Sequence, residues 1–219
     1  MSKRNRYATS ELIEAQFESR SSGRVLKNLL GIKGKREMDR AEAREQLRAL
    51  EYLSLTYDTR HRFTAADIRK MHEVWLGKIY GWAGHYRRVN LSKGDFPFAS
   101  SGQIPRLMTA FEKECLKKYT PCRFSSHEDI AKAIAVVHTE LVLIHPFREG
   151  NGRVARILSA LMAMQAGLPP LDFSGITGKK RQEYFAAVQA GLDGNYKPMF
   201  RIFYAVVRRT LRGRERARI

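Results

Sequence analysis

The sequence predicts an all-α fold that carries one small β-hairpin, and two observations support this prediction. Apolar side chains recur every three or four residues through most of the chain, which is the period of amphipathic helices that face a core. Residues 86–101 (YRRVNLSKGDFPFASS) depart from that period, because Gly94 and Pro97 separate short extended-looking pieces. The 219 residues contain no internal repeat and no flexible linker, so a single domain is expected.

Capping residues and apolar stripes justify the helices in order. Ser10 begins a short helix over 10–17, and a second helix follows over 40–57. The core face of that second helix is expected to hold Ala43, Leu47, Leu50, Leu53 and Tyr57. Thr64, followed three residues later by Asp67, is a capping-box pattern that begins the next helix.

The second half of the chain continues in the same way. Ser126 caps a helix over 127–144 whose apolar face is wide enough for a central, mostly buried position. Other helices are expected over 103–118, 153–166, 180–191 and 196–211. Four ring-bearing residues are interpreted as packing residues rather than catalytic groups: His72, Trp75, Trp82 and His138.

The charge of the chain is strongly positive and unevenly distributed. Forty Lys and Arg against 22 Asp and Glu give a net charge of +18 and a pI of about 10.2. Residues 208–219 hold six arginines and one glutamate, which is typical of a solvated helix face followed by a tail. An acidic partner is expected, and nucleic acid is disfavoured because no zinc-finger spacing or aromatic RNA-binding motif accompanies the charge. The sequence offers no run of roughly 18 apolar residues for a membrane span.

The two cysteines, Cys115 and Cys122, are too few for a disulfide framework or a zinc cage. That cysteine usage favours a reducing compartment, so a cytoplasmic location is expected. Neither cysteine stands in an arrangement with histidine that would suit a thiol nucleophile.

Chemistry is concentrated in residues 145–156, which read HPFREGNGRVAR between two helical segments. Gly150 and Gly152 free the backbone to turn its N–H groups toward one point, and a helix begins at once. Convergent amides at a helix N-terminus form a ready anion site. Arg153 and Arg156 lie three residues apart, so both guanidinium groups can reach the same phosphate oxygens.

Two further residues complete this segment. Glu149 is an acid in a positive setting, and Mg²⁺ between its carboxylate and phosphate oxygens would resolve the conflict. His145 is the nearby side chain able to accept a proton near neutral pH. The segment therefore indicates phosphate-group transfer from a nucleotide. It lacks the lysine and hydroxyl of a P-loop.

The same twelve residues match the Fic-family signature His-x-Phe-x-(Asp/Glu)-Gly-Asn-Gly-x-x-x-Arg without a mismatch. The chain thus resembles the Fic family over about residues 60–211, with residues 1–59 as an N-terminal helical extension and 212–219 as a basic tail. The resemblance implies a Fic-type helical bundle that transfers AMP from ATP and Mg²⁺ to a Tyr, Ser or Thr hydroxyl of a target protein, the chain itself included.

The resemblance also implies roles for individual residues. His145 would deprotonate the attacking hydroxyl, Phe147 would anchor the loop in the core, and Glu149 would hold Mg²⁺. The phosphates would be cradled and neutralised by Gly150, Asn151, Gly152, Arg153 and Arg156. The candidates for the adenine pocket are Tyr184, Asn195 and Tyr196.

Two other functions stay open. A related branch, the Doc-like toxins, phosphorylates its target and carries lysine where this chain has Gly152, so the glycine favours AMP transfer. A Doc-like phosphotransferase toxin is one alternative. A catalytically idle, basic nucleic-acid-binding module is the other.

Two segments outside the loop are assigned by the same resemblance. Residues 89–99 match the hairpin flap along which Fic proteins dock a target strand, with the candidate docking residues Val89, Leu91, Phe96 and Phe98. Ser10 and Glu14 fit an inhibitory pattern, (Ser/Thr)-x-x-x-Glu-(Gly/Asn), whose glutamate pairs with the second arginine of the loop. Ala15 departs from that pattern, so a capped helix without regulatory meaning, with a separate antitoxin chain or no inhibitor, is the alternative. A homodimer is a further partner that the sequence leaves open.

Overall fold

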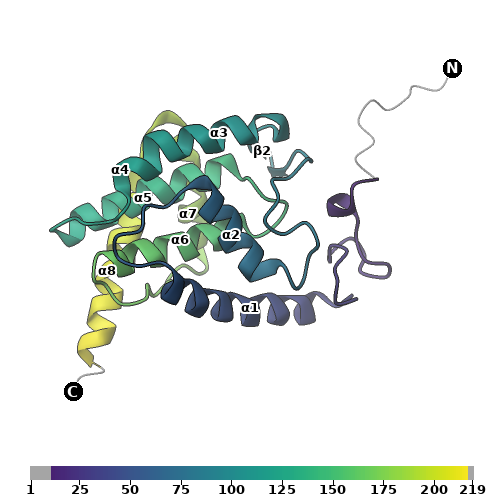
Figure 1. Ribbon diagram of the computed structural model, residues 1–219, viewed down its shortest axis with the longest axis horizontal. Helices are drawn as coiled ribbons and strands as arrows, with labels where there is room; N and C mark the ends of the chain where they lie inside the picture. Colours follow the sequence, from purple (N-terminus) through teal and green to yellow (C-terminus); the bar gives the residue numbers. More distant parts are fainter. Residues whose placement is uncertain (1–10, 217–219) are drawn as a thin grey trace.

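A computed structural model describes residues 11–216, with backbone alone for 214–216. The predicted fold is confirmed, because the chain forms a bundle of α-helices with one two-stranded hairpin (Figure 1). Within residues 11–216, none of the helices combines the length and the apolar character that crossing a bilayer requires.

The bundle is built around helix α5 (His127–Ile144), which packs against α6 (Asn151–Gln165) and α8 (Lys197–Arg216). Ser126 caps α5 as predicted, since its hydroxyl accepts a hydrogen bond from the N–H of Asp129 at 3.0 Å. The other end of α5 stops at His145, whose φ of 54° and ψ of 56° are left-handed. The short turn between α5 and α6 therefore holds the predicted catalytic segment.

Helices α1 (Lys35–Thr56) and α2 (Ala65–Leu76) cover one side of α6. The predicted capping box at the start of α2 is confirmed. The Thr64 hydroxyl accepts from the Asp67 N–H at 3.2 Å, and the Asp67 carboxylate accepts from the Thr64 N–H at 2.8 Å. The apolar face of this helix and of the turn after it is fully buried, at Ile68, Met71, Trp75 and Ile79.

The predicted core face of α1 is confirmed in its second half, where Leu53 is fully buried and Leu50 and Tyr57 pack against the core, and is wrong in its first half. Ala43 and Leu47 are exposed, and the leucine side chain is 73% accessible. The buried residues of the helix are Met38, Ala41, Glu42, Ala49 and Leu53, of which Leu53 was predicted. A buried glutamate explains the difference, because apolar periodicity counts a carboxylate as a solvent-facing residue unless its partners are known.

The N-terminal segment is mostly irregular. The helix predicted over 10–17 is reduced to η2 (Ile13–Ala15), one turn of 3₁₀-helix, and Phe17 then forms an antiparallel bridge with Leu26. So short a helix does not repay the cost of nucleation unless tertiary contacts support it. Ser10, the predicted cap, lies outside the described residues.

The hairpin and the remaining helices complete the fold. Strands β1 (Ser92–Lys93) and β2 (Phe96–Pro97) pair antiparallel, with Ser92 opposite Pro97 and Lys93 opposite Phe96. After the hairpin come η3 (Ser101–Gln103), α3 (Ile104–Phe111), a π-helical turn η4 (Glu112–Leu116) and α4 (Lys117–Tyr119). The C-terminal part contains α7 (Lys179–Ala190), η5 (Gly191–Asp193) and α8, which continues to Arg216 through position 212, where the sequence predicts a separate tail.

Candidate active site

The turn between α5 and α6 is held together by its own side chains. Phe147 is fully buried, which confirms it as the anchor of the turn. The Asn151 side chain brackets the Phe147 backbone, with Oδ1 accepting from its N–H at 2.8 Å and Nδ2 donating to its carbonyl at 2.7 Å. Asn151 is 2% exposed, so its amide side chain serves the turn rather than the phosphates. What remains for an anion at this position is the backbone N–H groups at the start of α6 that precede Arg153, because the Arg153 N–H already donates to the Gly150 carbonyl at 2.9 Å.

Gly150 occupies a position that no other residue could fill without displacement. Its φ is +83°, and a Cβ there would lie 2.6 Å from a ring carbon of buried Trp75. Close packing of the turn on α2 therefore requires glycine. Gly152 is different, since a Cβ there would approach the Tyr184 hydroxyl at an ordinary 4.0 Å.

His145 has the protonation state and orientation of a general base. Its Nδ1 lies 3.0 Å from the Val142 carbonyl, which can only accept, so Nδ1 carries the proton and Nε2 keeps its lone pair. Burial lowers the pKa of His145 to about 4, with Arg87 and Lys93 acting in the same direction and the Val142 carbonyl and Glu149 opposing them. The ring of Phe98 stacks on the imidazole, with centroids 3.5 Å apart and planes 14° apart. The imidazole is therefore neutral at pH 7 and covered by the hairpin.

Arg87 connects the hairpin to the turn, and sequence reasoning missed it. Its guanidinium donates to the carbonyls of His145 at 2.7 Å, Val89 at 2.6 Å and Ala99 at 2.6 Å, and its N–H donates to Pro146. The side chain is 1% exposed, and burial lowers its pKa to about 10. No local pattern distinguishes this cation from the other 39 in the chain, because its acceptors come from three separate segments.

Arg153 lies between two carboxylates. One of its terminal nitrogens is 2.6 Å from Glu42 on α1, and the other is 3.3 Å from Glu149 in the turn. The guanidinium also stacks over the Trp75 ring, 4.7 Å from its centroid. Glu42 was not among the predicted site residues. No signal in the sequence identifies it, because its burial and its contact with Arg153, 111 residues away, exist only in the folded chain.

Glu149 fits the predicted Mg²⁺ site. Its side chain is 45% exposed, and its carboxylate also accepts from the Gly150 N–H at 2.9 Å. In the described part of the chain, no three His, Cys, Asp or Glu side chains gather into a metal cage. Nucleotide-bound Mg²⁺ needs none, because phosphates and waters supply most of its oxygen ligands and the protein adds one or two carboxylates.

Arg156 faces two aromatic rings. Its guanidinium lies 5.5 Å from the Phe173 ring and 5.8 Å from the Tyr184 ring. Its Nε is buried and has no hydrogen-bond acceptor among the described residues. A buried charged donor without an acceptor is costly, so this nitrogen fits a site that an anion completes.

The three candidates for the adenine pocket lie in different places relative to the turn. Tyr184 lies beside Gly152 and Arg156, where its hydroxyl contacts Nε2 of buried His138 at 2.7 Å. The Tyr196 hydroxyl donates to Glu140 at 2.6 Å, and the exposed Asn195 accepts from the Lys197 N–H. Within residues 11–216, neither Asn195 nor Tyr196 forms a hydrogen bond, ion pair or ring contact with residues 145–156. Tyr184 is therefore the candidate that the fold brings to the site.

Glu14 does not make the predicted ion pair with Arg156. Its carboxylate accepts from the Arg88 backbone N–H at 2.7 Å, and its carbonyl accepts from the Arg148 guanidinium at 2.8 Å. The side chain is 7% exposed, so these contacts hold the N-terminal segment against the turn and the base of the hairpin. The short motif resembles an inhibitory helix, but this segment is a single 3₁₀ turn and the Glu14 carboxylate contacts the Arg88 backbone rather than Arg156.

The hairpin candidates also differ in position. Val89 is buried, whereas Leu91, Phe96 and Phe98 are partly exposed. Lys93 at the hairpin places its ammonium 3.1 Å from the centre of the Phe185 ring on α7. The hairpin thus spans from the base histidine to α7.

The residues predicted to be packing groups are buried as expected. His138 and Trp75 are at most 1% exposed and Trp82 is 7% exposed. His72 is fully buried and has a further role, because it stacks on Phe147 with centroids 3.8 Å apart and its Nε2 lies 3.1 Å from the Glu149 carbonyl. Burial raises the pKa of both cysteine thiols to about 12, which agrees with the prediction that neither is a nucleophile.

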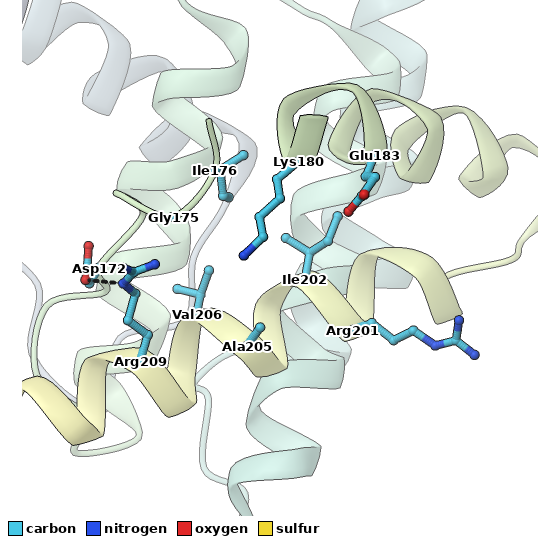
Figure 2. Close-up of a pocket in the computed structure, with 10 residues that line it drawn as sticks. All are labelled: Asp172, Gly175, Ile176, Lys180, Glu183, Arg201, Ile202, Ala205, Val206 and Arg209. Atoms are coloured by element: carbon cyan, nitrogen blue, oxygen red, sulfur yellow. Dashed lines mark ion pairs between the residues drawn. The ribbon is translucent and has the colours of Figure 1, made fainter. Parts of the chain in front are cut away.

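A cavity of about 200 Å³ lies elsewhere, between residues 172–176, the start of α7 and α8 (Figure 2). Ile176, Ile202 and Val206 form an apolar wall, and Lys180 extends toward it from α7. Arg209 pairs with Asp172 at 3.0 Å on its rim. None of the predicted site residues lines it, so it is separate from the turn at residues 145–156.

The fold and the site together define a class of protein: a helical bundle that presents one histidine and two arginines around the first turn of a buried helix. A sequence model described as the Fic/DOC family matches residues 62–163. The chain is 30% identical over 189 residues to the protein adenylyltransferase Fic of Aedes aegypti, and 28% identical to that of Culex quinquefasciatus. Each alignment covers 85% of this chain, which spans 36% of the length of those relatives.

Solved structures of Fic domains have a similar fold. BepC, a VirB-translocated effector of Bartonella tribocorum with bound AMPPNP, has 27% identity and a TM-score of 0.66 over 83% of this chain and 91% of that one. The N-terminal Fic domain of a VirB-translocated effector from Bartonella quintana with bound ADP has 29% identity and a TM-score of 0.68, covering 87% and 92%. The chain belongs to the Fic/DOC family.

Proposed function

We propose that this protein is an adenylyltransferase that moves AMP from ATP to a Tyr, Ser or Thr hydroxyl of a target protein. The observation that carries the proposal is a neutral His145, whose Nε2 keeps its lone pair, in the same turn as Arg156, whose buried Nε has no acceptor among the described residues. The relatives named protein adenylyltransferases support the same reaction, as does the nucleotide bound in similar structures.

In this reaction, His145 accepts the proton of the target hydroxyl as the oxygen attacks the α-phosphorus of ATP. The new P–O bond forms while the bond to the bridging oxygen breaks, and pyrophosphate leaves. The first amides of α6, with Arg153 and Arg156, hold the phosphate oxygens and stabilise the charge that moves to the leaving group. Positioning and electrostatics therefore provide most of the rate enhancement.

Glu149 is the residue that would hold Mg²⁺, whose role when bound is to neutralise phosphate charge and fix its orientation. His72 fixes the backbone of Glu149 from the core side of the turn. Its Nε2 donates to the Glu149 carbonyl, and its Nδ1 accepts from the Gly84 N–H at 2.9 Å. The carboxylate is thus carried on a backbone fixed from the core.

AMP transfer is favoured over phosphoryl transfer by the position of Gly152. The absence of a side chain leaves space between the turn and Tyr184, where a lysine at this position would project. The target strand would pair along residues 89–99, and Phe98 would have to move from the His145 ring for the hydroxyl to reach Nε2. Autoadenylylation, a separate antitoxin chain, a second copy of the chain and a cytoplasmic location stay predictions.

The experiment uses ATP labelled with ³²P at either the α or the γ position, incubated with Mg²⁺, the protein and a cell lysate. Label from the α position on protein, lost in His145→Ala, is the expected result. Transfer of γ label would indicate a phosphotransferase. No transfer of either label, with DNA binding that weakens steeply with salt, would contradict the enzyme assignment.

A further inference from the structure

Glu42 is an acid that belongs to the N-terminal extension and yet reaches the nucleotide site. It lies on α1, outside the residues that match the family model, and it is 2% exposed. One carboxylate oxygen accepts from the Tyr80 hydroxyl at 2.8 Å, and the other pairs with Arg153 at 2.6 Å. Trp75 donates its indole N–H to the Glu42 carbonyl at 2.9 Å, so backbone and side chain are both fixed.

These contacts fix the Arg153 guanidinium from two sides. Glu42 holds one terminal nitrogen and the Trp75 ring supports one face. The arginine side chain is still 31% exposed, and a guanidinium has five N–H donors, so donors remain for an anion. The folded protein strongly favours this pair, because a buried carboxylate without its cation is destabilising.

We propose that Glu42 is a positioning residue that preorganises Arg153 to bind the phosphates of the nucleotide. This inference rests on the proposed function. Glu149 also approaches Arg153, at 3.3 Å, but its carboxylate is half exposed and is the one that would hold Mg²⁺. Glu42 therefore has a second effect: because it makes the shorter contact with the guanidinium, at 2.6 Å, the longer contact of Glu149 is the one that a metal can replace.

A neutral side chain at position 42 should affect both partners. Arg153 would then have Glu149 as its single nearby carboxylate, and the guanidinium would turn toward it. Phosphate binding would lose a preorganised donor, and Mg²⁺ would compete with an arginine for its ligand. Binding of the nucleotide should weaken more than the chemical step slows, because the base His145 is not touched.

The test measures binding of AMPPNP with Mg²⁺ by calorimetry to the full chain, in the wild type, Glu42→Gln, Arg153→Ala and the double variant. Glu51→Gln is the control, since it removes an exposed acid from the same helix. Glu42→Gln should bind about tenfold more weakly, as expected for a lost charge-assisted contact, and should need more Mg²⁺ for half-saturation. Glu51→Gln should bind like the wild type. In the Arg153→Ala background, Glu42→Gln should cause no further loss.

Other outcomes overturn the inference. Equal or tighter binding by Glu42→Gln would show that the acid is irrelevant or restrains Arg153, and an equal loss in the Arg153→Ala background would indicate a structural effect alone. If Glu42→Gln does not fold, as judged by circular dichroism, Tyr80→Phe replaces it. That variant keeps the charge, releases one anchor, and should bind about threefold more weakly; unchanged binding would contradict the inference. A wild type that binds no AMPPNP would refute the proposed function itself.

Discussion

Replacement of Gly150 by alanine tests whether the packing of the turn on α2 sets the geometry of the site. The backbone there has a φ of +83°, and the added Cβ would lie 2.6 Å and 2.9 Å from two ring carbons of Trp75 and 3.3 Å from Leu76. Both neighbours are fully buried, so neither can move away freely. The turn itself must shift.

The magnitude has two parts. A left-handed backbone costs alanine about 1–2 kcal/mol relative to glycine. Overpacking against a buried ring costs about 1–3 kcal/mol more. Gly194→Ala provides the matched control, because its φ is +68° and a Cβ there has nothing within 4 Å. The loss of unfolded-chain entropy is the same for both variants and cancels in their comparison.

The assay is urea unfolding of both variants, paired with the rate of α-label transfer. Gly150→Ala should lose about 1–3 kcal/mol more of its free energy of unfolding than Gly194→Ala. Its transfer rate should fall by about a hundredfold, since a displacement of about 1 Å at a reacting group has that effect. Equal stability and equal activity in the two variants would refute the claim that Trp75 fixes the turn.

Three further predictions follow from the same contacts. Arg87→Lys, whose single ammonium cannot serve three carbonyls in separate directions, should lower the free energy of unfolding in urea by about 2–4 kcal/mol, and an unchanged value would contradict its role. His72 and His138 have pKa values lowered to about 3 by burial, so between pH 6.5 and 3 the unfolded chain binds protons that the native state does not. Stability is therefore complete above pH 6.5 and should fall by about 1.4 kcal/mol per pH unit for each histidine below it, which urea titrations at pH 7, 6 and 5 would detect. Phe98→Ala uncovers His145 and should raise the pKa of its imidazole from about 4 toward its ordinary value, as measured by NMR titration. An unchanged pKa in this variant would exclude the hairpin as the cause of the low value.

Local chemistry predicted the parts of the fold that depend on neighbours in the sequence. The caps at Thr64 and Ser126 were predictable because each acceptor lies three residues from its donor. The turn at residues 145–156 was predictable for a similar reason: its anchor, glycines and arginines all fall within twelve positions. Patterns of this kind are predictable because their contacts are made between residues that are close in the sequence.

The residues that reasoning from sequence missed depend on contacts between distant segments. Arg87 is buried because carbonyls at positions 89, 99 and 145 converge on it. Glu42 is buried because Arg153, 111 residues away, and Tyr80 meet it. A cation or a carboxylate of this kind is predicted to face solvent until its partners are known, and that is why the first half of the α1 face was predicted wrongly.

Glu14 shows the opposite case, in which a short pattern predicts a contact that the structure does not contain, and its inhibitory role stays a prediction. Five residues matched an inhibitory helix, but η2 has a single turn and its glutamate bonds to the Arg88 backbone. The nucleotide candidates Asn195 and Tyr196 were chosen by position after the turn; their side chains contact Lys197 and Glu140, and their contact with a nucleotide stays a prediction. A short sequence motif indicates a role reliably only when the fold shows which residues its side chains contact.

The most direct test of the account is a crystal structure of the protein with AMPPNP and Mg²⁺. We expect the triphosphate on the first amides of α6, with an oxygen accepting from Nε of Arg156 and the α-phosphorus within reach of a hydroxyl held by His145. A nucleotide bound elsewhere, with the turn unchanged and Arg156 still lacking an acceptor, would contradict the assignment of this turn as the site of transfer.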